Sequence, residues 1–215
     1  MGVGHTLISG VCPTLIGLRA LREGVRVGHF GEVWLSLRKQ MMNMNKEIYF
    51  AAGCFWGAEK YLKLIRGVIS TEVGFANGNT QNPTYKEVYT DTTGYAECVH
   101  VTYDPQVIAI DKLTRIYFKA IDPTSLNKQG EDEGTRYRTG VYYSADTDAA
   151  TVELLQKVFD EQQQALEPGQ KLAVELLPLK NFYRAEEYHQ DYLDKNPTGY
   201  CHLTPALFRL AAESN

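Results

Sequence analysis

The chain has 215 residues, a net charge of −4 and 44% hydrophobic residues, which is the composition of an ordinary globular protein. This length is enough for one substantial core but short for two. The acidic balance argues against a nucleic-acid-binding surface, and no apolar run reaches the ~20 residues of a membrane helix. We expect a cytoplasmic monomer that binds neither nucleic acid nor membranes.

Residues 1–43 differ from the rest of the chain because basic residues outnumber acidic ones there. No basic residue precedes the interrupted apolar stretch 3–18, so a secretory signal is not expected. Residues 1–6 match the short myristoylation pattern, which recurs by chance. We interpret 1–43 as a poorly ordered extension or a mis-assigned start, 44–205 as the catalytic domain and 206–215 as a C-terminal tail.

The first elements in chain order are two strands separated by a helix. Residues 47–52 are rich in aromatic and branched side chains and end at Gly53, which is typical of a strand. Apolar residues then recur at helical spacing over 54–66, and a second strand is predicted over 68–75. A loop rich in turn residues follows. Over residues 97–103 the side chains alternate with a period of two, which is typical of a strand.

The second half continues the mixture of helices and strands. Helices are predicted over 111–121, 147–166 and 184–194, strands over 140–144 and 172–177, and turns from 196 onward. Strands mixed with helices without strict alternation indicate an α+β fold. We expect a single-domain two-layer α/β sandwich with a mixed sheet flanked by helices and a long irregular C-terminal tail.

The four cysteines, Cys12, Cys54, Cys98 and Cys201, lie far apart without a CxxC pair, so neither a zinc site nor a disulfide framework is predicted. Cys54 lies where a strand becomes a helix, and the positive end of a helix raises the thiolate fraction. We therefore expect the Cys54 thiol to be ionised at rest. A buried structural cysteine is the alternative, and Cys98 is interpreted as a core residue.

The residues beside Cys54 also suit a reactive site. Gly53 removes side-chain bulk and lets a ligand approach the backbone. Phe55 and Trp56 follow directly, and two large rings beside a nucleophile can form an apolar pocket. Large aromatic residues also pack inside proteins, so a core role remains open for both.

The stretch GCFWG at 53–57, following a short strand, resembles the signature of the methionine sulfoxide reductase A family. Further segments match in the family's order: VGFANG at 73–78, NPTYKEV at 82–88, TGYAE at 93–97, YDP at 103–105, QGEDEGTRYRT at 129–139 and YHQDYL at 188–193. The resemblance covers about residues 48–202. It implies reduction of the S epimer of methionine sulfoxide, free or in proteins, as repair after oxidative damage, with no metal or organic cofactor.

The resemblance assigns Cys54 as the nucleophile, which becomes a sulfenic acid, and Glu97 as the proton donor. Strand alternation places Glu97 on the face of Val99 and Val101, where desolvation would raise its pKa and keep it protonated. An edge-strand glutamate facing solvent is the alternative.

By the same resemblance, five residues bind substrate: Phe55, Trp56, Tyr85, Asp132 and Tyr137. Phe55 and Trp56 would hold the S-methyl group, and the two tyrosine hydroxyls would hold the sulfoxide oxygen as neutral donors. Glu131 and Glu133 flank Asp132, where the family more often has Asn and Arg. This loop is therefore more acidic, which bears on substrate preference.

Cys201 matches the family's resolving cysteine, and no further cysteine follows it. The resemblance thus implies a Cys54–Cys201 disulfide that thioredoxin reduces directly. Of the histidines, His189 is interpreted as structural, and His100 and His202 offer no ligand cluster in the sequence.

Two other functions fit parts of the pattern. A papain-like thiol hydrolase would pair Cys54 with His189, which lies at a suitable spacing downstream, but the residues around Cys54 depart from that signature. A non-catalytic redox-sensing module would use only the oxidation of Cys54. Multiple-turnover reduction of a methionine sulfoxide substrate would exclude this second alternative.

Overall fold

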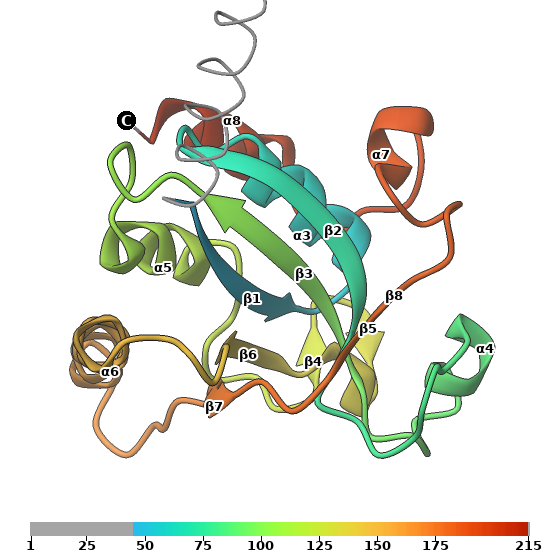
Figure 1. Ribbon diagram of the computed structural model, residues 1–215, viewed down its shortest axis with the longest axis horizontal. Coiled ribbons are helices and arrows are strands. Elements are labelled where there is room, and N and C mark those ends of the chain that lie inside the picture. Colours follow the sequence, from blue (N-terminus) through green and yellow to red (C-terminus); the bar gives the residue numbers. More distant parts are fainter. Residues whose placement is uncertain (1–44, 215) are drawn as a thin grey trace, which may run out of the picture. The chain divides into compact units, whose positions relative to one another are not determined.

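A six-stranded mixed sheet organises residues 45–214, the part of the chain that the computed structural model describes (Figure 1). The strands run in the order β7-β6-β1-β3-β2-β8. Their bounds are β1 (Lys46–Ala52), β2 (Val68–Ala76), β3 (Ala96–Tyr103), β6 (Thr139–Tyr143), β7 (Glu175–Pro178) and β8 (Phe182–Arg184). The expectations for residues 1–43 lie outside the described residues.

Helices flank this sheet, which confirms the predicted α+β class. They are α3 (Phe55–Lys63), α4 (Tyr85–Val88), α5 (Ile110–Phe118), α6 (Ala149–Gln164), α7 (Tyr192–Lys195) and α8 (Pro205–Glu213). A small hairpin of β4 (Lys128–Gln129) and β5 (Asp132–Glu133) leads into a 3₁₀ turn over Thr135–Tyr137. Within residues 45–214, no helix is both long and apolar enough to cross a bilayer.

The register of β3 decides which side chains meet on each face of the sheet. β3 runs antiparallel to both neighbours, with Val99 opposite Phe50 of β1 and Val73 of β2. Because side chains alternate along a strand, Glu97, Val99 and Val101 share the face that carries the main core. Cys98 points to the other face.

The main core lies between the sheet and the helices and contains about thirty buried apolar residues, among them Phe50, Tyr61 and Leu113. Fully burying one such side chain stabilises the fold by about 1.5–3 kcal/mol. The buried tyrosines also satisfy their hydroxyls: Tyr61 donates to Ile116 O and Tyr117 donates to Ala51 O, each at 2.8 Å. These bonds fix α5 to α3 and to the end of β1.

Helix α3 packs against α7 and α8 as well as against the sheet. Lys63 in its last turn forms an ion pair with Asp194 of α7 at 2.8 Å. From α8, Leu207 and Phe208 pack against the main core. Two segments from the C-terminal part of the chain therefore lie on the helix that follows Cys54 (Figure 1).

The strands predicted around 47–52, 68–75, 97–103 and 140–144 are confirmed within two residues, but the helix predicted over 184–194 is wrong. That segment holds the end of β8, turns and the single turn α7. The Gln190 side chain explains the difference, because its amide accepts from Val73 N and donates to Val73 O, each at 2.9 Å. It thus takes the place of a strand partner along β2.

The turn-like ending predicted from 196 onward is also wrong beyond Thr204, because α8 begins at Pro205. A proline in the first turn directly after a threonine N-cap is a helix-start signal that was present in the sequence. The irregular part of the C-terminal region is confined to the connections before α8.

Candidate active site

Cys54 stands between β1 and α3 as the N-cap residue of the helix. Gly53 makes this turn possible with a φ of +78°, and a Cβ there would lie 2.7 Å from Gln129 Cβ. The side chain of Cys54 caps no helix N–H, while its carbonyl accepts from Ala58 N at 3.3 Å. The turn therefore presents a 6%-exposed thiol at the start of α3.

Glu97 lies next to this thiol, since its Oε2 accepts a hydrogen bond from the backbone N–H of Phe55 at 3.0 Å. Its side chain is buried on the main-core face of β3, as the strand alternation predicted, and does not face solvent. Burial raises the pKa of Glu97 to about 8, against the opposing effects of the Phe55 N–H and of Arg136. The carboxyl group is therefore predominantly protonated at neutral pH.

The expectation that the Cys54 thiol is ionised at rest is wrong for the substrate-free protein. Burial raises the pKa of Cys54 well above its ordinary value, and nearby Glu97 raises it further. The backbone N–H groups of Trp56 and Gly57 act in the opposite direction, as a helix start should. Desolvation is the larger effect here, so the resting site carries two protons, one on Cys54 and one on Glu97.

Tyr85 and Tyr137 approach the same two groups from separate loops. Tyr85 begins α4, whose start is fixed by a capping box between Thr84 and Glu87. Tyr137 ends the 3₁₀ turn and is 7% exposed. Burial first, and then Glu97, raises the pKa of both phenols, to which Cys54 also contributes. Both hydroxyls are therefore neutral donors.

Sequence reasoning missed the residues that position Tyr137. Asp91 Oδ1 accepts from the backbone N–H of Arg136 at 3.0 Å, and the two side chains form an ion pair. The Arg136 guanidinium also lies 4.1 Å from the Tyr89 ring centroid and 4.3 Å from that of Tyr137. The Asp91 carboxylate thus binds both the backbone and the side chain of Arg136, and loss of this aspartate would leave a buried charge unpaired, although nothing in the local sequence connects the two.

Phe55 and Trp56 have different surroundings. The Phe55 ring is 1% exposed and packs near Phe75 and Tyr85, so it belongs to the core. The Trp56 ring is partly buried and stacks on Tyr192 at a centroid distance of 3.8 Å. Of the two, Trp56 is the ring with exposed surface beside Cys54.

His189 completes this aromatic cluster. Its Nδ1 accepts a hydrogen bond from Trp56 Nε1 at 3.0 Å, and its ring lies 4.4 Å from that of Tyr85. Burial lowers the pKa of His189, so the ring is neutral. These contacts agree with the structural role predicted for His189 and give no support to the hydrolase alternative.

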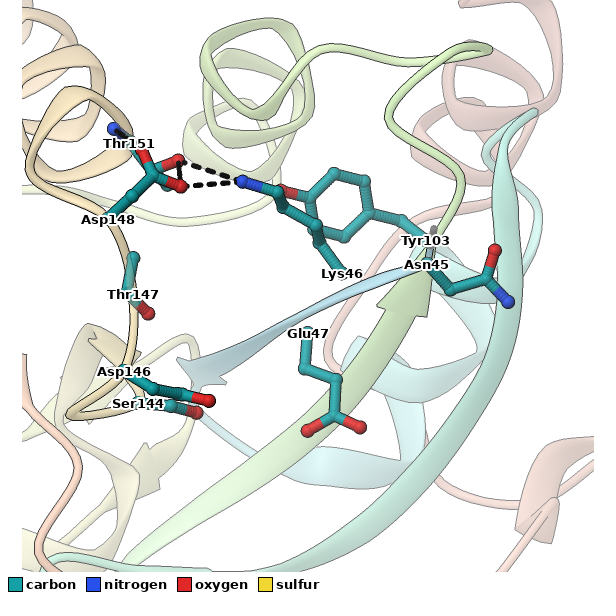
Figure 2. Close-up of a pocket in the computed structure, with 9 residues that line it drawn as sticks. All are labelled: Asn45, Lys46, Glu47, Tyr103, Ser144, Asp146, Thr147, Asp148 and Thr151. Atoms are coloured by element: carbon teal, nitrogen blue, oxygen red, sulfur yellow. Dashed lines mark hydrogen bonds and ion pairs between the residues drawn. The ribbon is translucent and has the colours of Figure 1, made fainter. Parts of the chain in front are cut away.

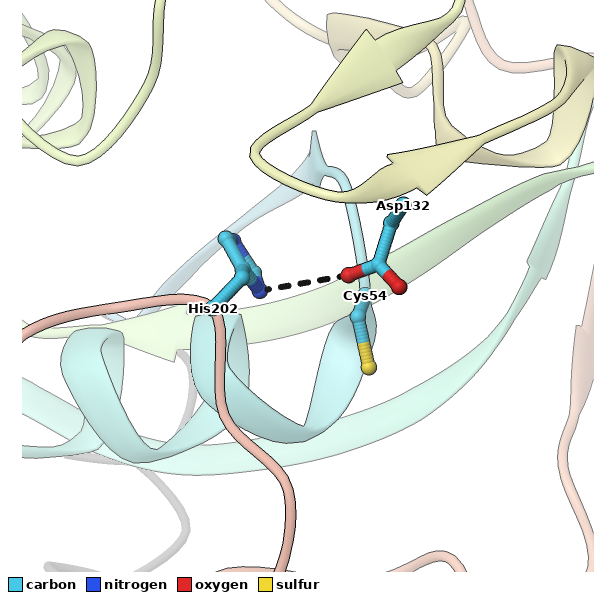
Figure 3. A group of neighbouring side chains, drawn as sticks. All are labelled: Cys54, Asp132 and His202. Carbon is cyan, nitrogen blue, oxygen red and sulfur yellow. Dashed lines mark ion pairs between the residues drawn. The ribbon is translucent and has the colours of Figure 1, made fainter.

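Asp132, in β5, is brought next to Cys54 together with a residue that the sequence did not connect with it. One ligand-type atom from each of Cys54, Asp132 and His202 lies within 4.8 Å of the other two (Figure 3). His202 Nδ1 is 3.8 Å from Asp132 Oδ2. Burial lowers the pKa of His202 despite the nearby Asp132 and the Ala52 carbonyl. The interpretation of His202 as a histidine without potential co-ligands is therefore wrong.

Cys201 lies against the first turn of α3. A Cβ on Gly57 would be 3.0 Å from Cys201 Sγ, so the glycine is what permits this approach. Cys201 Sγ accepts from Leu203 N at 3.3 Å, and the residue is half-buried. The sulfur borders a groove of about 450 Å³ that is also lined by Lys60 and Phe208. The fold thus brings the two cysteines to the same helical turn.

Another pocket lies at the opposite end of β1 (Figure 2). It has a volume of about 350 Å³, and the ion pair between Lys46 and Asp148, at 2.6 Å, lies along it. Lys46 begins the strand after which Cys54 follows, so the two ends are roughly 20 Å apart at the rise of a β-strand. Among the described residues 45–214, no cysteine or histidine lines this pocket, and we assign the chemistry to the Cys54 end.

Comparison with known proteins agrees with this geometry. The family model described as peptide methionine sulfoxide reductase matches residues 46–214. The peptide methionine sulfoxide reductase MsrA of Lachnoclostridium phytofermentans is 53% identical over 165 residues, which is 77% of this chain and 96% of that protein.

Solved structures give the same result. Reduced Mxr1 from Saccharomyces cerevisiae superposes with a TM-score of 0.69 at 40% identity, covering 75% of this chain and 92% of that one. Methionine sulfoxide reductase A of Corynebacterium diphtheriae gives 0.70 at 38% identity, with coverages of 74% and 78%. The chain therefore belongs to the peptide methionine sulfoxide reductase family.

Proposed function

We propose that the protein reduces the S epimer of methionine sulfoxide, free or in proteins, with Cys54 as the nucleophile and Glu97 as the acid. The observation that supports this most directly is the hydrogen bond from Phe55 N to the buried Glu97 carboxyl, one residue after Cys54. This contact supports Glu97 as the proton donor for a thiol at the start of a helix. The phenols of Tyr85 and Tyr137 reach the same place.

In the first step, Cys54 Sγ attacks the sulfoxide sulfur while the sulfoxide oxygen accepts a proton from Glu97. The thiol proton replaces the one that Glu97 has given up. The attack forms an S–S bond to a substrate sulfur that now carries a hydroxyl group. This hydroxyl then moves to Cys54 Sγ: the substrate S–O bond and the S–S bond break, an S–O bond to Cys54 forms, and the products are methionine and Cys54 sulfenic acid. Atoms balance without any added electron donor, because the two electrons come from Cys54.

Tyr85 and Tyr137 donate hydrogen bonds to the sulfoxide oxygen as negative charge develops on it. Their neutrality suits this, since a phenolate would repel the oxygen. Trp56 offers the exposed ring face against which the neutral S-methyl group packs, and Phe55 supports that ring from the core. Asp132 borders the site from β5 and, with Glu131 and Glu133, sets its preference among substrates.

In the second step, Cys201 converts the sulfenic acid on Cys54 into a disulfide after methionine has left. Cys201 Sγ attacks the sulfur of the Cys54 sulfenic acid, which forms a Cys54–Cys201 disulfide and releases water. The position of Cys201 against Gly57 in the first turn of α3 supports this pairing. Cys98 lies on the other face of the sheet and takes no part.

A dithiol reductant of the thioredoxin type then reduces the disulfide. Cys201 is half-buried and borders an open groove, while Cys54 is 6% exposed. Attack at the accessible Cys201 sulfur releases the Cys54 thiol and leaves a mixed disulfide, which the second reductant thiol resolves. We also propose a reducing, cytoplasmic compartment and a monomeric enzyme.

The test uses resolved R and S sulfoxides and the variant Cys201→Ser. Wild-type protein with thioredoxin should turn over the S epimer only. Cys201→Ser should form one equivalent of methionine in a single turnover and then stop, because thioredoxin has no disulfide to reduce. Cys98→Ser is the matched control and should cycle normally. Normal thioredoxin turnover in Cys201→Ser would refute the assigned second step.

A further inference from the structure

We propose that Cys54, Asp132 and His202 form a site for a borderline-soft divalent cation such as Zn²⁺ in the reduced protein. The three donors are a thiol sulfur, a carboxylate oxygen and an imidazole nitrogen, which is a donor set that zinc prefers. They come from the start of α3, the hairpin strand β5 and the loop before α8 (Figure 3).

The distances suit tetrahedral coordination. Zinc binds sulfur at about 2.3 Å and nitrogen or oxygen at about 2.0–2.2 Å, so its ligand atoms lie about 3.3–3.8 Å apart. His202 Nδ1 and Asp132 Oδ2 are already 3.8 Å apart. All three donor atoms lie within 4.8 Å of one another, so a contraction of at most about 1–1.5 Å closes the site.

Two of the three residues, Asp132 and His202, also hold donor atoms without a hydrogen-bond partner among residues 45–214. The His202 side chain is 4% exposed, with the Ala52 carbonyl near its ring, and its Nδ1 atom has no hydrogen-bond partner. Asp132 Oδ2 is likewise buried without a hydrogen bond. Buried polar atoms are normally satisfied, so unpartnered atoms from two residues facing the Cys54 thiol point to a ligand between them.

Three protein ligands leave the fourth position for water, as in zinc sites that bind a further ligand. On binding, Cys54 Sγ gives its proton to solvent and forms the bond to the metal. Under the proposed function, the bond to the metal draws electron density from the sulfur and blocks the approach of the sulfoxide. The cation would therefore inhibit the reduced enzyme reversibly, and a chelator would restore activity.

The test is a titration of the fully reduced full-length chain with Zn²⁺ against a chromogenic chelator, without any sulfoxide present. We expect one equivalent to bind and Mg²⁺ not to compete, because Mg²⁺ prefers oxygen ligands. His202→Ala and Asp132→Asn should each weaken zinc binding at least about tenfold. With Co²⁺ as the probe, a thiolate-to-cobalt charge-transfer band should appear and should be absent in Cys54→Ser.

Two controls make the result specific. His100→Ala removes a histidine from the other face of the sheet and should bind Zn²⁺ as the wild type does. Cys201→Ser should also retain binding, because Cys201 is not among the three ligands. If His202→Ala unfolds, His202→Gln, which keeps most of the side-chain volume, replaces it, with circular dichroism as the check.

Several outcomes would overturn the site: no stoichiometric binding, unchanged affinity in the folded His202 variant, or lost affinity in Cys201→Ser. Reductase activity in chelator-treated protein is measured separately. An active enzyme that binds no zinc would sink this proposal alone, whereas zinc binding by a protein inactive toward sulfoxides would sink the proposed function alone.

Discussion

Cys54 and Cys98 are both buried thiols, yet their surroundings differ in kind. Cys98 is 0% exposed among Tyr49, Ala51 and Tyr142 on one face of the sheet. Its sulfur lies 4.0 Å from the carbonyl of Val99, and Arg138 is close enough to lower its pKa, against the larger effect of burial. Cys54 lies beyond the other face, beside helix N–H groups and the protonated Glu97.

Burial raises the pKa of both thiols, so exposure and resting charge do not separate the reactive sulfur from the inert one. The neighbours do. Cys54 lies beside the buried carboxyl of Glu97 and the N–H groups of a helix start, whereas Cys98 lies on the opposite face of the sheet, away from that carboxyl and from the helix start. If Cys54 acts as proposed, its proton must leave when substrate binds, because burial keeps the thiol protonated in the empty site.

The largest effect should come from exchanging the two sulfurs for hydroxyls. Cys54→Ser should lower the reduction rate at least about 10³-fold, since a serine hydroxyl cannot replace the thiolate. Cys98→Ser should change the rate by less than about twofold and lower the free energy of unfolding by about 1 kcal/mol, as core substitutions commonly do. Single-turnover methionine formation and urea melts measure the two. Comparable rate losses in Cys54→Ser and Cys98→Ser would contradict the assignment of Cys54 alone as the nucleophile.

The second-largest effect should come from removing the carboxyl group of Glu97. Glu97→Gln should lower kcat by about 10²–10⁴-fold, the usual contribution of a positioned general acid. Wild-type kcat should fall as pH rises through about 8, because burial raises the pKa of Glu97 to that value and only the protonated form donates. Stopped-flow rates from pH 6 to 9 test this. If kcat of Glu97→Gln still falls as the pH rises through 8, a group other than Glu97 is the acid.

The free energy of unfolding should depend on pH because of the same buried carboxyl group, that of Glu97. Burial raises the pKa of Glu97 in the folded protein to about 8, from the ordinary 4.5. The protonated carboxyl therefore contributes its full stabilisation below pH 4.5, and this contribution is lost as the pH rises through 8. Glu59 acts in the same direction, with a pKa raised to about 7 by burial. The free energy of unfolding should therefore decline over this window, and the part of the decline above pH 7 should vanish in Glu97→Gln.

The phenols should contribute less than the acid. Tyr85→Phe and Tyr137→Phe should each lower kcat about ten- to a hundredfold, because each removes one neutral donor to the sulfoxide oxygen. The double variant should lose more than either single one. Tyr95→Phe, which removes a hydroxyl bonded to the Thr80 carbonyl outside the site, is the control and should retain the wild-type kcat.

Gly57→Ala should have the smallest effect, confined to the second step. The added methyl would lie 3.0 Å from Cys201 Sγ and 3.3 Å from His202 Cε1, so the C-terminal loop must shift. We expect disulfide formation to slow several-fold while the single-turnover formation of methionine stays the same. Rapid quench with alkylation of free thiols separates the two rates, and equal slowing of both would contradict the assigned contact.

Local sequence predicted the parts of the site that local structure creates. The strand ending at Gly53 and the helix that follows fix Cys54, and period-two alternation placed Glu97 on the core face. The resting charge of Cys54 was predicted wrongly because the helix start was visible in the sequence while the desolvation around it was not. Burial depends on residues far along the chain.

The parts that failed depend on side chains acting over long separations. Gln190 substitutes for a strand partner of Val73 and so prevents the predicted helix over 184–194. The contact of His202 with Asp132 links a hairpin to a late loop. No spacing rule connects such residues, and only the folded arrangement shows that they meet.

The loop that carries Cys201 is held at both ends by one helix. The ion pair of Lys63 with Asp194 holds its beginning, and the packing of α8 against α3 holds its end. Residues 196–204 are thereby a short tether, and tethering confers a millimolar or higher effective concentration on the sulfur that it carries. Closure of the disulfide should then outpace attack by free cellular thiols and protect the sulfenic acid from over-oxidation.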